Sequence, residues 1–323
     1  MIREKTEGDG EKSGVTPLVG MLLIFAILVS LLDLVQLTAV PVWNQAEEFN
    51  HQTEVQNDLQ GLSAEIQMTA STGTVGSTAV GMGMRYSHRA FTRSPPSPTG
   101  TLSVGKESGF AVENAVAVND VTREYWNGTR KELTTARLTY EPRYNEIEGL
   151  TTVHEGNVMY NRQRGDSVLA SERKPVDGRT LRLTALDGNF SRTAVRATDV
   201  ETFPVSAPAQ RVSVTPDGDS PLRFELPTGL PERKWDELLG PETEENGGYV
   251  ADYAVNNGDI TVEMVTERDN DTVTYSLYMA KVGVGQDFGE PSAEYVTTPE
   301  GRGTRGVVES NMTLPLAVKV RDA

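Results

Sequence analysis

The sequence predicts a mainly β domain, antiparallel and sandwich-like, that follows a long N-terminal transmembrane and stalk α-helix. Residues 15–32 form a run of 18 positions without a charged side chain. Apolar residues then recur at spacings of three and four in residues 43–72, and beyond residue 100 the pattern changes to period two with turn residues between the runs. These two periods are typical of a helix and of half-buried strands, respectively.

The apolar run is long enough to cross a membrane. At ~1.5 Å per residue, 18 residues cover a hydrocarbon core of ~30 Å. We therefore expect a transmembrane helix over residues 15–42, with Asp33 near the outer interface. A cleaved secretory signal fits poorly, because its apolar core is usually about 7–15 residues long.

The charges on either side of this segment indicate its orientation. Arg3, Lys5 and Lys12 precede the segment, and no Lys or Arg follows it until Arg85. Because positive flanks stay inside, we expect a cytoplasmic N-terminus and an extracellular C-terminal domain, in a single-pass protein of the cell membrane.

The residues at the start of the segment are more specific than its hydropathy. A short polar leader ends in KSG and is followed by VTPLVG and a Leu/Ile/Val-rich helix. This stretch resembles the archaeal type IV pilin N-terminus, with matches at Lys12, Gly14, Val15, Thr16, Pro17, Val19 and Gly20. The resemblance implies that a prepilin-type peptidase cuts between Gly14 and Val15, so that residues 1–14 are a leader.

Residues 43–72 are predicted to form an amphipathic stalk helix. Pro41 is expected to kink or interrupt the chain just above the bilayer, and Trp43 suits the headgroup region. A narrow apolar stripe packs either on the β domain of the same chain, which we favour, or on neighbouring copies. The stripe consists of Val55, Leu59, Leu62 and Ile66.

The rest of the chain is read as a Gly/Pro-rich connection, residues 73–100, and a β-rich extracellular domain, residues 101–323. Within the domain, Asp187-Gly188 and Asn257-Gly258 are hairpin signals. One short helix is expected within residues 230–240, with its apolar face formed by Leu230, Trp235, Leu238 and Leu239.

Composition limits the partners and the chemistry. The net charge of −16 makes nucleic acid an improbable partner, because phosphate binding needs a basic face. The chain has no cysteine, and His51, His88 and His154 lie far apart in sequence, so we expect no metal site, no cofactor and no thiol chemistry.

The acidic composition also bears on the environment of the protein. Arg far outnumbers Lys, and acidic residues exceed both, which favours a protein that stays soluble in very high salt over an ordinary acidic extracellular domain. A second stretch resembles uncharacterised haloarchaeal proteins that carry the same N-terminal segment, at Tyr86, Arg89, Phe91, Pro95, Pro96, Gly100 and Leu102.

Three further motifs carry little chemistry. GRGTRG at residues 301–306 has dinucleotide-loop spacing but no helix after it, so we interpret it as a flexible loop. The acidic triplets at residues 217–219 and 269–271 lack calcium-loop spacing and are read as turns. Sequons for N-glycosylation occur at Asn127, Asn189, Asn270 and Asn311.

These observations leave three function classes. The pilin resemblance favours a pilus-related or minor-pilin-like structural subunit without catalysis, whose partners are the lipid bilayer, the prepilin-type peptidase and identical or related pilin-like subunits packed through the N-terminal helix. The size of the β domain favours a membrane-tethered binding or adhesion module that is not assembled into a filament. A tethered hydrolase is the third class.

Overall fold

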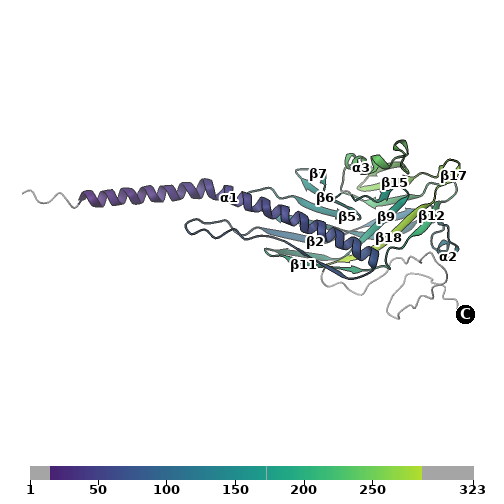
Figure 1. Cartoon of the computed structure of the whole chain (residues 1–323), viewed down its shortest axis with the longest axis horizontal. Coiled ribbons are helices and arrows are strands. Elements are labelled where there is room, and N and C mark those ends of the chain that lie inside the picture. The colour runs from purple at the N-terminus through teal and green to yellow at the C-terminus, as the bar shows by residue number, and fades with distance from the viewer. Residues whose placement is uncertain (1–14, 172, 286–323) are drawn as a thin grey trace, which may run out of the picture.

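The computed structural model describes residues 15–171 and 173–285 of the chain. A single long helix, α1 (Val15–Thr72), runs into a β domain and packs against it along its second half (Figure 1). Its first half protrudes from the domain as a separate rod. At 1.5 Å per residue, α1 is about 87 Å long.

The remaining elements are mostly strands, with two more short α-helices and two 3-10 turns. The helices are α2 (Asp120–Arg123) and α3 (Glu232–Leu239), and the 3-10 turns are η1 (Gly240–Glu242) and η2 (Glu244–Asn246). The strands are β1 (Gly76–Val80), β2 (Thr99–Glu113), β3 (Ala115–Ala117), β4 (Lys131–Arg143), β5 (Thr151–Glu155), β6 (Val158–Gln163), β7 (Asp166–Leu169), β8 (Val176–Asp177), β9 (Thr180–Asp187), β10 (Phe190–Ala194), β11 (Thr198–Pro204), β12 (Val212–Pro216), β13 (Arg223–Pro227), β14 (Val250–Asn256), β15 (Asp259–Met264), β16 (Glu267–Arg268), β17 (Asp271–Thr272) and β18 (Tyr275–Val284).

The strands form two large sheets. The 9-stranded sheet has the order β14-β15-β13-β2-β4-β5-β6-β7, with β10 also paired to β2. The 7-stranded sheet has the order β1-β11-β18-β12-β3, with β9 paired to β18 and β8 to β9. The pairings are antiparallel except that of β9 with β18, so the predicted mainly β, antiparallel class is confirmed with one parallel exception.

One long strand in each sheet divides one of its edges between two partners. In β2, residues 100–104 pair with β10 and residues 111–113 with β13. In β18, residues 275–277 pair with β12 and residues 282–284 with β11. The register of β2 against β4 also shifts between Gly105 and Ser108. Such an irregularity bends a strand, and here it separates the two ends of the domain.

The core accordingly has two parts. The part distant from the protruding helix contains Phe224, Trp235 and Tyr275. The other part is built around α1 and is completed by side chains of β2, β4, β11 and β18. The predicted apolar stripe lies in this second part, and the prediction that it packs on the domain of its own chain is confirmed. The exposed fractions of its members are Val55 1%, Leu59 3%, Leu62 0% and Ile66 0%.

The structure decides one expectation and corrects two others. Of the kink or interruption expected at Pro41, the interruption is absent, because α1 runs through Pro41, and Figure 1 shows a change in direction where the helix reaches the domain. The expected connection at residues 73–100 contains strand β1, which pairs with β11. Asp187-Gly188 does not form a hairpin, since β9 and β10 belong to different sheets.

Other local predictions are confirmed. Asn257 and Gly258 have positive φ angles of 55° and 91° and join β14 to β15, as expected of a tight hairpin turn. The acidic triplets lie in turns, one of them between β16 and β17. Helix α3 buries its predicted apolar residues Trp235, Leu238 and Leu239, and Leu230 just before the helix is buried with them, each at most 5% exposed.

We predict that Leu62→Ala destabilises the domain by about 2–5 kcal/mol, because it leaves a cavity in the buried cluster around α1. Met68→Ala on the same helix is the matched control, since Met68 is 56% exposed. The control should change stability by less than about 0.5 kcal/mol. Denaturant unfolding of the full chain in detergent measures both, and equal losses would show that α1 is not part of the core.

Candidate functional site

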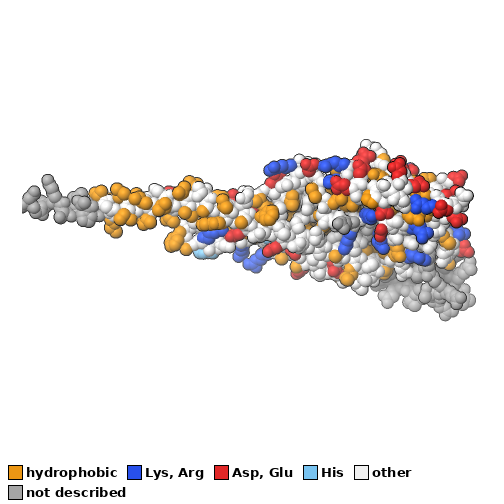
Figure 2. Space-filling view, turned by 45° about the horizontal axis from the view of Figure 1, so that its top comes forward, with side chains coloured by type: hydrophobic (Ala, Val, Ile, Leu, Met, Phe, Trp, Pro, Cys, Tyr) orange, Lys and Arg blue, Asp and Glu red, His pale blue; other side chains and the backbone are white. Residues whose placement is uncertain are grey.

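The first half of α1 presents an apolar surface that the described residues leave uncovered. Most of its large apolar side chains from Leu18 to Leu37 are 40–76% exposed. Figure 2 shows this stem as a mostly hydrophobic rod beside a domain of mixed charge. Among the described residues, α1 is the one helix that is long and apolar enough to cross a membrane. We call residues 18–37 the stem.

The stem ends where polar side chains of α1 become buried. Val40, Asn44 and Glu48 follow one another at intervals of four and are 2%, 0% and 0% exposed. They lie on one face of the helix and continue the apolar stripe that begins at Val55. The buried face of α1 is therefore apolar deep in the domain and polar near the stem.

Glu48 is the centre of this polar part. Its carboxylate accepts hydrogen bonds from the backbone N–H groups of Asn145 (2.8 Å), Glu146 (2.8 Å) and Ile147 (2.9 Å), and from the Tyr86 hydroxyl. A buried carboxylate is costly unless hydrogen bonds replace its water. Burial and the bond to Glu48 raise the pKa of Tyr86, which keeps this hydroxyl protonated as a donor.

A second group of contacts joins α1 to residues 84–97, which we call the basic loop. The Arg89 guanidinium donates to Asn44 Oδ1 (2.8 Å) and to Glu47 Oε1 (2.7 Å). It also lies 5.2 Å from the centre of the Trp43 ring. Cation–π and charge-assisted contacts from one side chain fix the loop against the helix just above the stem.

Deeper in the domain, further polar residues of α1 bind the sheets. His51 Nδ1 lies 2.8 Å from the Tyr144 hydroxyl. Ser63 Oγ lies 3.1 Å from His154 Nε2, and Thr69 Oγ1 lies 2.7 Å from Thr202 Oγ1. The two histidines thus serve contacts between α1 and the sheet, while His88 is exposed on the basic loop.

Sequence reasoning missed the polar stripe. The apolar pattern alone does not single out Asn44 and Glu48, because polar side chains are usually exposed. Their position on the helix is the signal that the sequence contains, since spacings of three and four extend backwards from Val55 through Gln52 to Glu48 and Asn44. Gln52 Oε1 indeed accepts from the backbone N–H of Leu150 at 3.1 Å.

The predicted modification sites are separated from one another. Val15 is the first residue of α1, whereas Gly14 lies outside the described residues. Asn127, Asn189 and Asn270 are all exposed, with Asn270 in the turn between β16 and β17. Asn311 and the motif at residues 301–306 lie outside the described residues as well.

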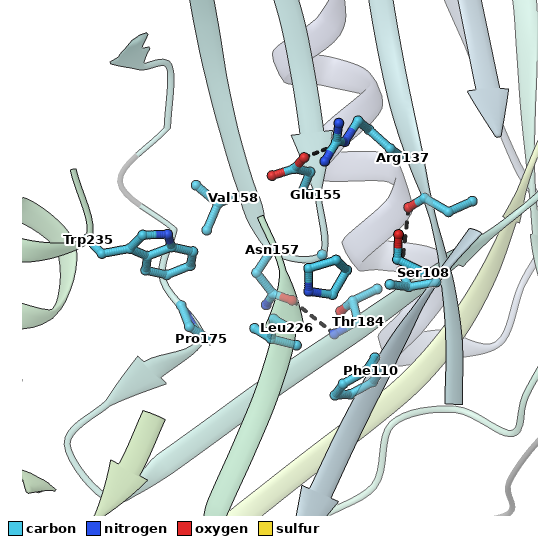
Figure 3. A pocket seen from close by; sticks show the side chains of 14 residues that line it. Ser108, Phe110, Arg137, Glu155, Asn157, Val158, Pro175, Thr184, Leu226 and Trp235 are labelled. Carbon is cyan, nitrogen blue, oxygen red and sulfur yellow. Dashed lines mark hydrogen bonds and ion pairs between the residues drawn. The ribbon is translucent and has the colours of Figure 1, made fainter. Parts of the chain in front are cut away.

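The cavity drawn in Figure 3 has a volume of about 30 Å³. Such a volume holds about one or two water molecules. Its polar groups bind one another, since Glu155 pairs with Arg137 and accepts from the Gly229 N–H at 2.8 Å, and Asn157 accepts from the Thr184 N–H at 2.9 Å. Burial raises the pKa of Glu155. The arrangement is structural and too small for a substrate.

A larger, open groove of about 530 Å³ lies between the end of α1 and β9. Arg173, Lys174 and Arg182 line it together with Tyr278, over whose ring the Arg182 guanidinium lies at 5.6 Å. Lys174 is paired with Glu242. Within residues 15–171 and 173–285, the groove included, no group of three or more His, Asp or Glu is placed to hold a metal ion.

We predict that Glu48→Gln destabilises the contact between α1 and residues 144–147. The amide retains one acceptor oxygen but turns N–H donors toward backbone N–H groups that need an acceptor. Loss of one hydrogen bond to a charged group costs about 1.5–3 kcal/mol. Glu54→Gln, at an exposed position of the same helix, is the control. Faster hydrogen exchange at residues 145–147 is expected in Glu48→Gln alone, and equal exchange in both variants would contradict the role of Glu48.

A second prediction concerns pH. Burial, assisted by Arg173, lowers the pKa of His154 to about 4. The unfolded chain takes up this proton near pH 6.5, so the free energy of unfolding falls as the pH decreases from about 6.5 to 4, by up to about 3 kcal/mol. His154→Gln should weaken that fall, whereas His88→Gln at an exposed site should not. Unfolding measured between these pH values tests this, and identical pH profiles for His154→Gln and the wild type would refute it.

Comparison with known proteins adds one similarity. The chain is 22% identical over 197 residues to an uncharacterized protein of Archaeoglobus fulgidus, covering 61% of this chain and 33% of that protein. The chain thus spans about a third of the length of the curated relative it matches. No protein-family model matches the chain, and no solved structure matches it.

Proposed function

We propose that the protein is a single-pass, membrane-anchored surface protein with a pilin-like N-terminus, acting as a pilus-related or minor-pilin-like structural subunit without catalysis. The observation that carries the proposal is the continuity of α1. One helix forms both the bare apolar stem and the centre of the β-domain core. The stem is therefore a rigid extension of the domain.

A rigid extension suits assembly. In a filament, the stem of each subunit packs against the stems of its neighbours, exchanging lipid contacts for helix contacts. Because α1 is continuous, such packing also determines where each β domain sits. A plain anchor has no need for this continuity, since a flexible linker would hold a domain at the surface equally well.

The proposed orientation rests on the flanking charges. Arg3, Lys5 and Lys12 precede the stem, which favours a cytoplasmic N-terminus and an extracellular β domain. Exposure of Asn127, Asn189 and Asn270 is compatible with glycosylation on that side. The net charge of −16, with few lysines, supports a surface adapted to high salt and a haloarchaeal origin.

A membrane-tethered binding or adhesion module is the second candidate. The observation that favours it is the open groove with Arg173, Lys174 and Arg182, whose cations and the Tyr278 ring suit an anionic ligand such as an acidic glycan. A tethered hydrolase has less support. His51 and His154 are engaged in contacts between α1 and the β domain, and the cavity in Figure 3 has room for about one or two water molecules.

The test of the pilin-like proposal is the N-terminus of the native protein. Processing between Gly14 and Val15 would leave Val15 first, with its α-amine at the membrane edge, and N-terminal sequencing or intact mass should find it. Gly14→Leu should block processing by crowding the small-residue position of the peptidase. Gly10→Leu, inside the leader but away from the cut, should be processed normally. A chain that still begins at Met1 or Ile2 would reject the proposal and leave a simple signal anchor.

A further inference from the structure

The basic loop differs from the rest of this acidic chain. Residues 84–97 contain three arginines and one histidine and no acidic residue, whereas the whole chain has a net charge of −16. At its tip, the Phe91 side chain is 83% exposed. Arg85, His88 and Arg93 are exposed as well. The loop thus combines a highly exposed aromatic ring with local positive charge.

The loop is held level with the end of the stem. Gln36 donates through Nε2 to the Arg93 carbonyl oxygen at 2.7 Å, and its Oε1 accepts from the Arg93 N–H at 2.8 Å. In Figure 1 the dark-blue loop runs back from the sheet along α1 toward the protruding half of the helix. In Figure 2, blue and pale blue side chains lie beside hydrophobic ones at this place.

The contacts described above keep the loop in position. Arg89 binds Asn44 and Glu47, and the Ser87 N–H donates to Glu47 Oε2 at 2.9 Å. Asn145 Nδ2 also donates to the Pro96 carbonyl oxygen at 2.8 Å. The exposed side chains at the tip are therefore presented from a backbone that is fixed to α1 on both sides of the tip.

The length of the stem places the tip at a membrane surface. From Val15 to Gln36 the helix rises about 32 Å, close to the ~30 Å hydrocarbon thickness of a bilayer. With the stem in a membrane, Gln36 and the tip beside it lie where hydrocarbon gives way to headgroups. Leu34 and Leu37, at the same level of α1, are 56% and 76% exposed.

We infer that the basic loop is a lipid-contacting site that binds the outer surface of an anionic bilayer. Phe91 enters the boundary between acyl chains and headgroups, where aromatic side chains are favoured. Arg85 and Arg93 bind headgroup phosphates, to which a guanidinium group can donate two hydrogen bonds at once. Two points of contact, stem and loop, hold the domain at one depth and one orientation. This inference rests on the membrane anchoring proposed above.

A neighbouring copy is the competing occupant of this surface. A second copy of this acidic chain could offer carboxylates to the arginines of the loop. The exposed Phe91, however, lies at the level of the stem where lipid acyl chains would surround it. The position of the loop at the end of the stem, its positive charge and the exposed Phe91 ring together match a phospholipid surface. Measuring the label at different protein-to-lipid ratios distinguishes lipid from a neighbouring copy.

The absence of cysteine makes a site-specific experiment direct. The full chain, carrying Ala90→Cys with a nitroxide label next to Phe91, is reconstituted into phosphatidylglycerol vesicles, and collisions with oxygen and with a water-soluble nickel chelate are measured by electron paramagnetic resonance. Leu28→Cys in the stem is the lipid reference. Val121→Cys, 71% exposed on α2 at the opposite end of the molecule, is the water reference.

The loop label should resemble Leu28→Cys in its exclusion of nickel and differ from Val121→Cys. Water-like values at residue 90, with lipid-like values at residue 28, would overturn the loop inference and leave the anchor intact. Water-like values at residue 28 would overturn the anchor itself. Nickel exclusion at residue 90 that disappears when the protein is diluted in lipid would assign the surface to a neighbouring copy and reject the lipid site.

Substitutions then test the two chemistries. Phe91→Ser and Arg93→Gln, each in the Ala90→Cys background, should shift the loop label toward the water reference. Arg196→Gln, at an exposed site outside the loop, should leave it unchanged. Replacing phosphatidylglycerol by phosphatidylcholine should reproduce the effect of Arg93→Gln. Equal nickel exclusion in the two lipids would reject the assignment of the arginines to anionic headgroups.

Discussion

A single unbroken helix has an uncovered apolar half and a half buried in the β domain, and the rest of the structure depends on that constraint. The 58 residues of α1 form one continuous helix, yet the stem has no cover among the described residues, while the second half packs against the β domain. A helix satisfies its own backbone groups, so it needs no change in secondary structure where its surroundings change. Only its side chains have to change, and they do so around Val40.

The change takes place through a polar zone. Buried Asn44 and Glu48 require partners, and loops of the β domain supply them through Arg89, Tyr86 and the backbone N–H groups of residues 145–147. Hydrogen bonds have directions that apolar contacts lack, so they determine the rotation and the axial position of the helix relative to the sheets. The apolar stripe beyond them buries apolar side chains against the domain, which adds stability.

This arrangement makes the domain and the stem one mechanical unit. The part of the core built around α1 loses its centre without this helix, because Leu62 and Ile66 belong to the same buried cluster as side chains from both sheets. Any force or packing that acts on the stem is therefore transmitted to the β domain. Filament assembly and fixed presentation at a membrane surface both use such a unit, which is why the continuity of α1 supports the proposed function.

The sequence by itself determined what depends on neighbours in the chain. The uncharged run of residues 15–32, the stripe from Val55 to Ile66, the Asn257-Gly258 turn and helix α3 were all readable, because periodicity and turn chemistry are local. Tertiary structure alone decided the burial of Glu48, the parallel pairing of β9 with β18 and the placing of Asp187-Gly188 between two sheets. Each of these depends on partners far away in the chain, which local patterns do not encode. The basic loop belongs to this second group, since its composition was visible but its place beside Gln36 was set by hydrogen bonds across the fold.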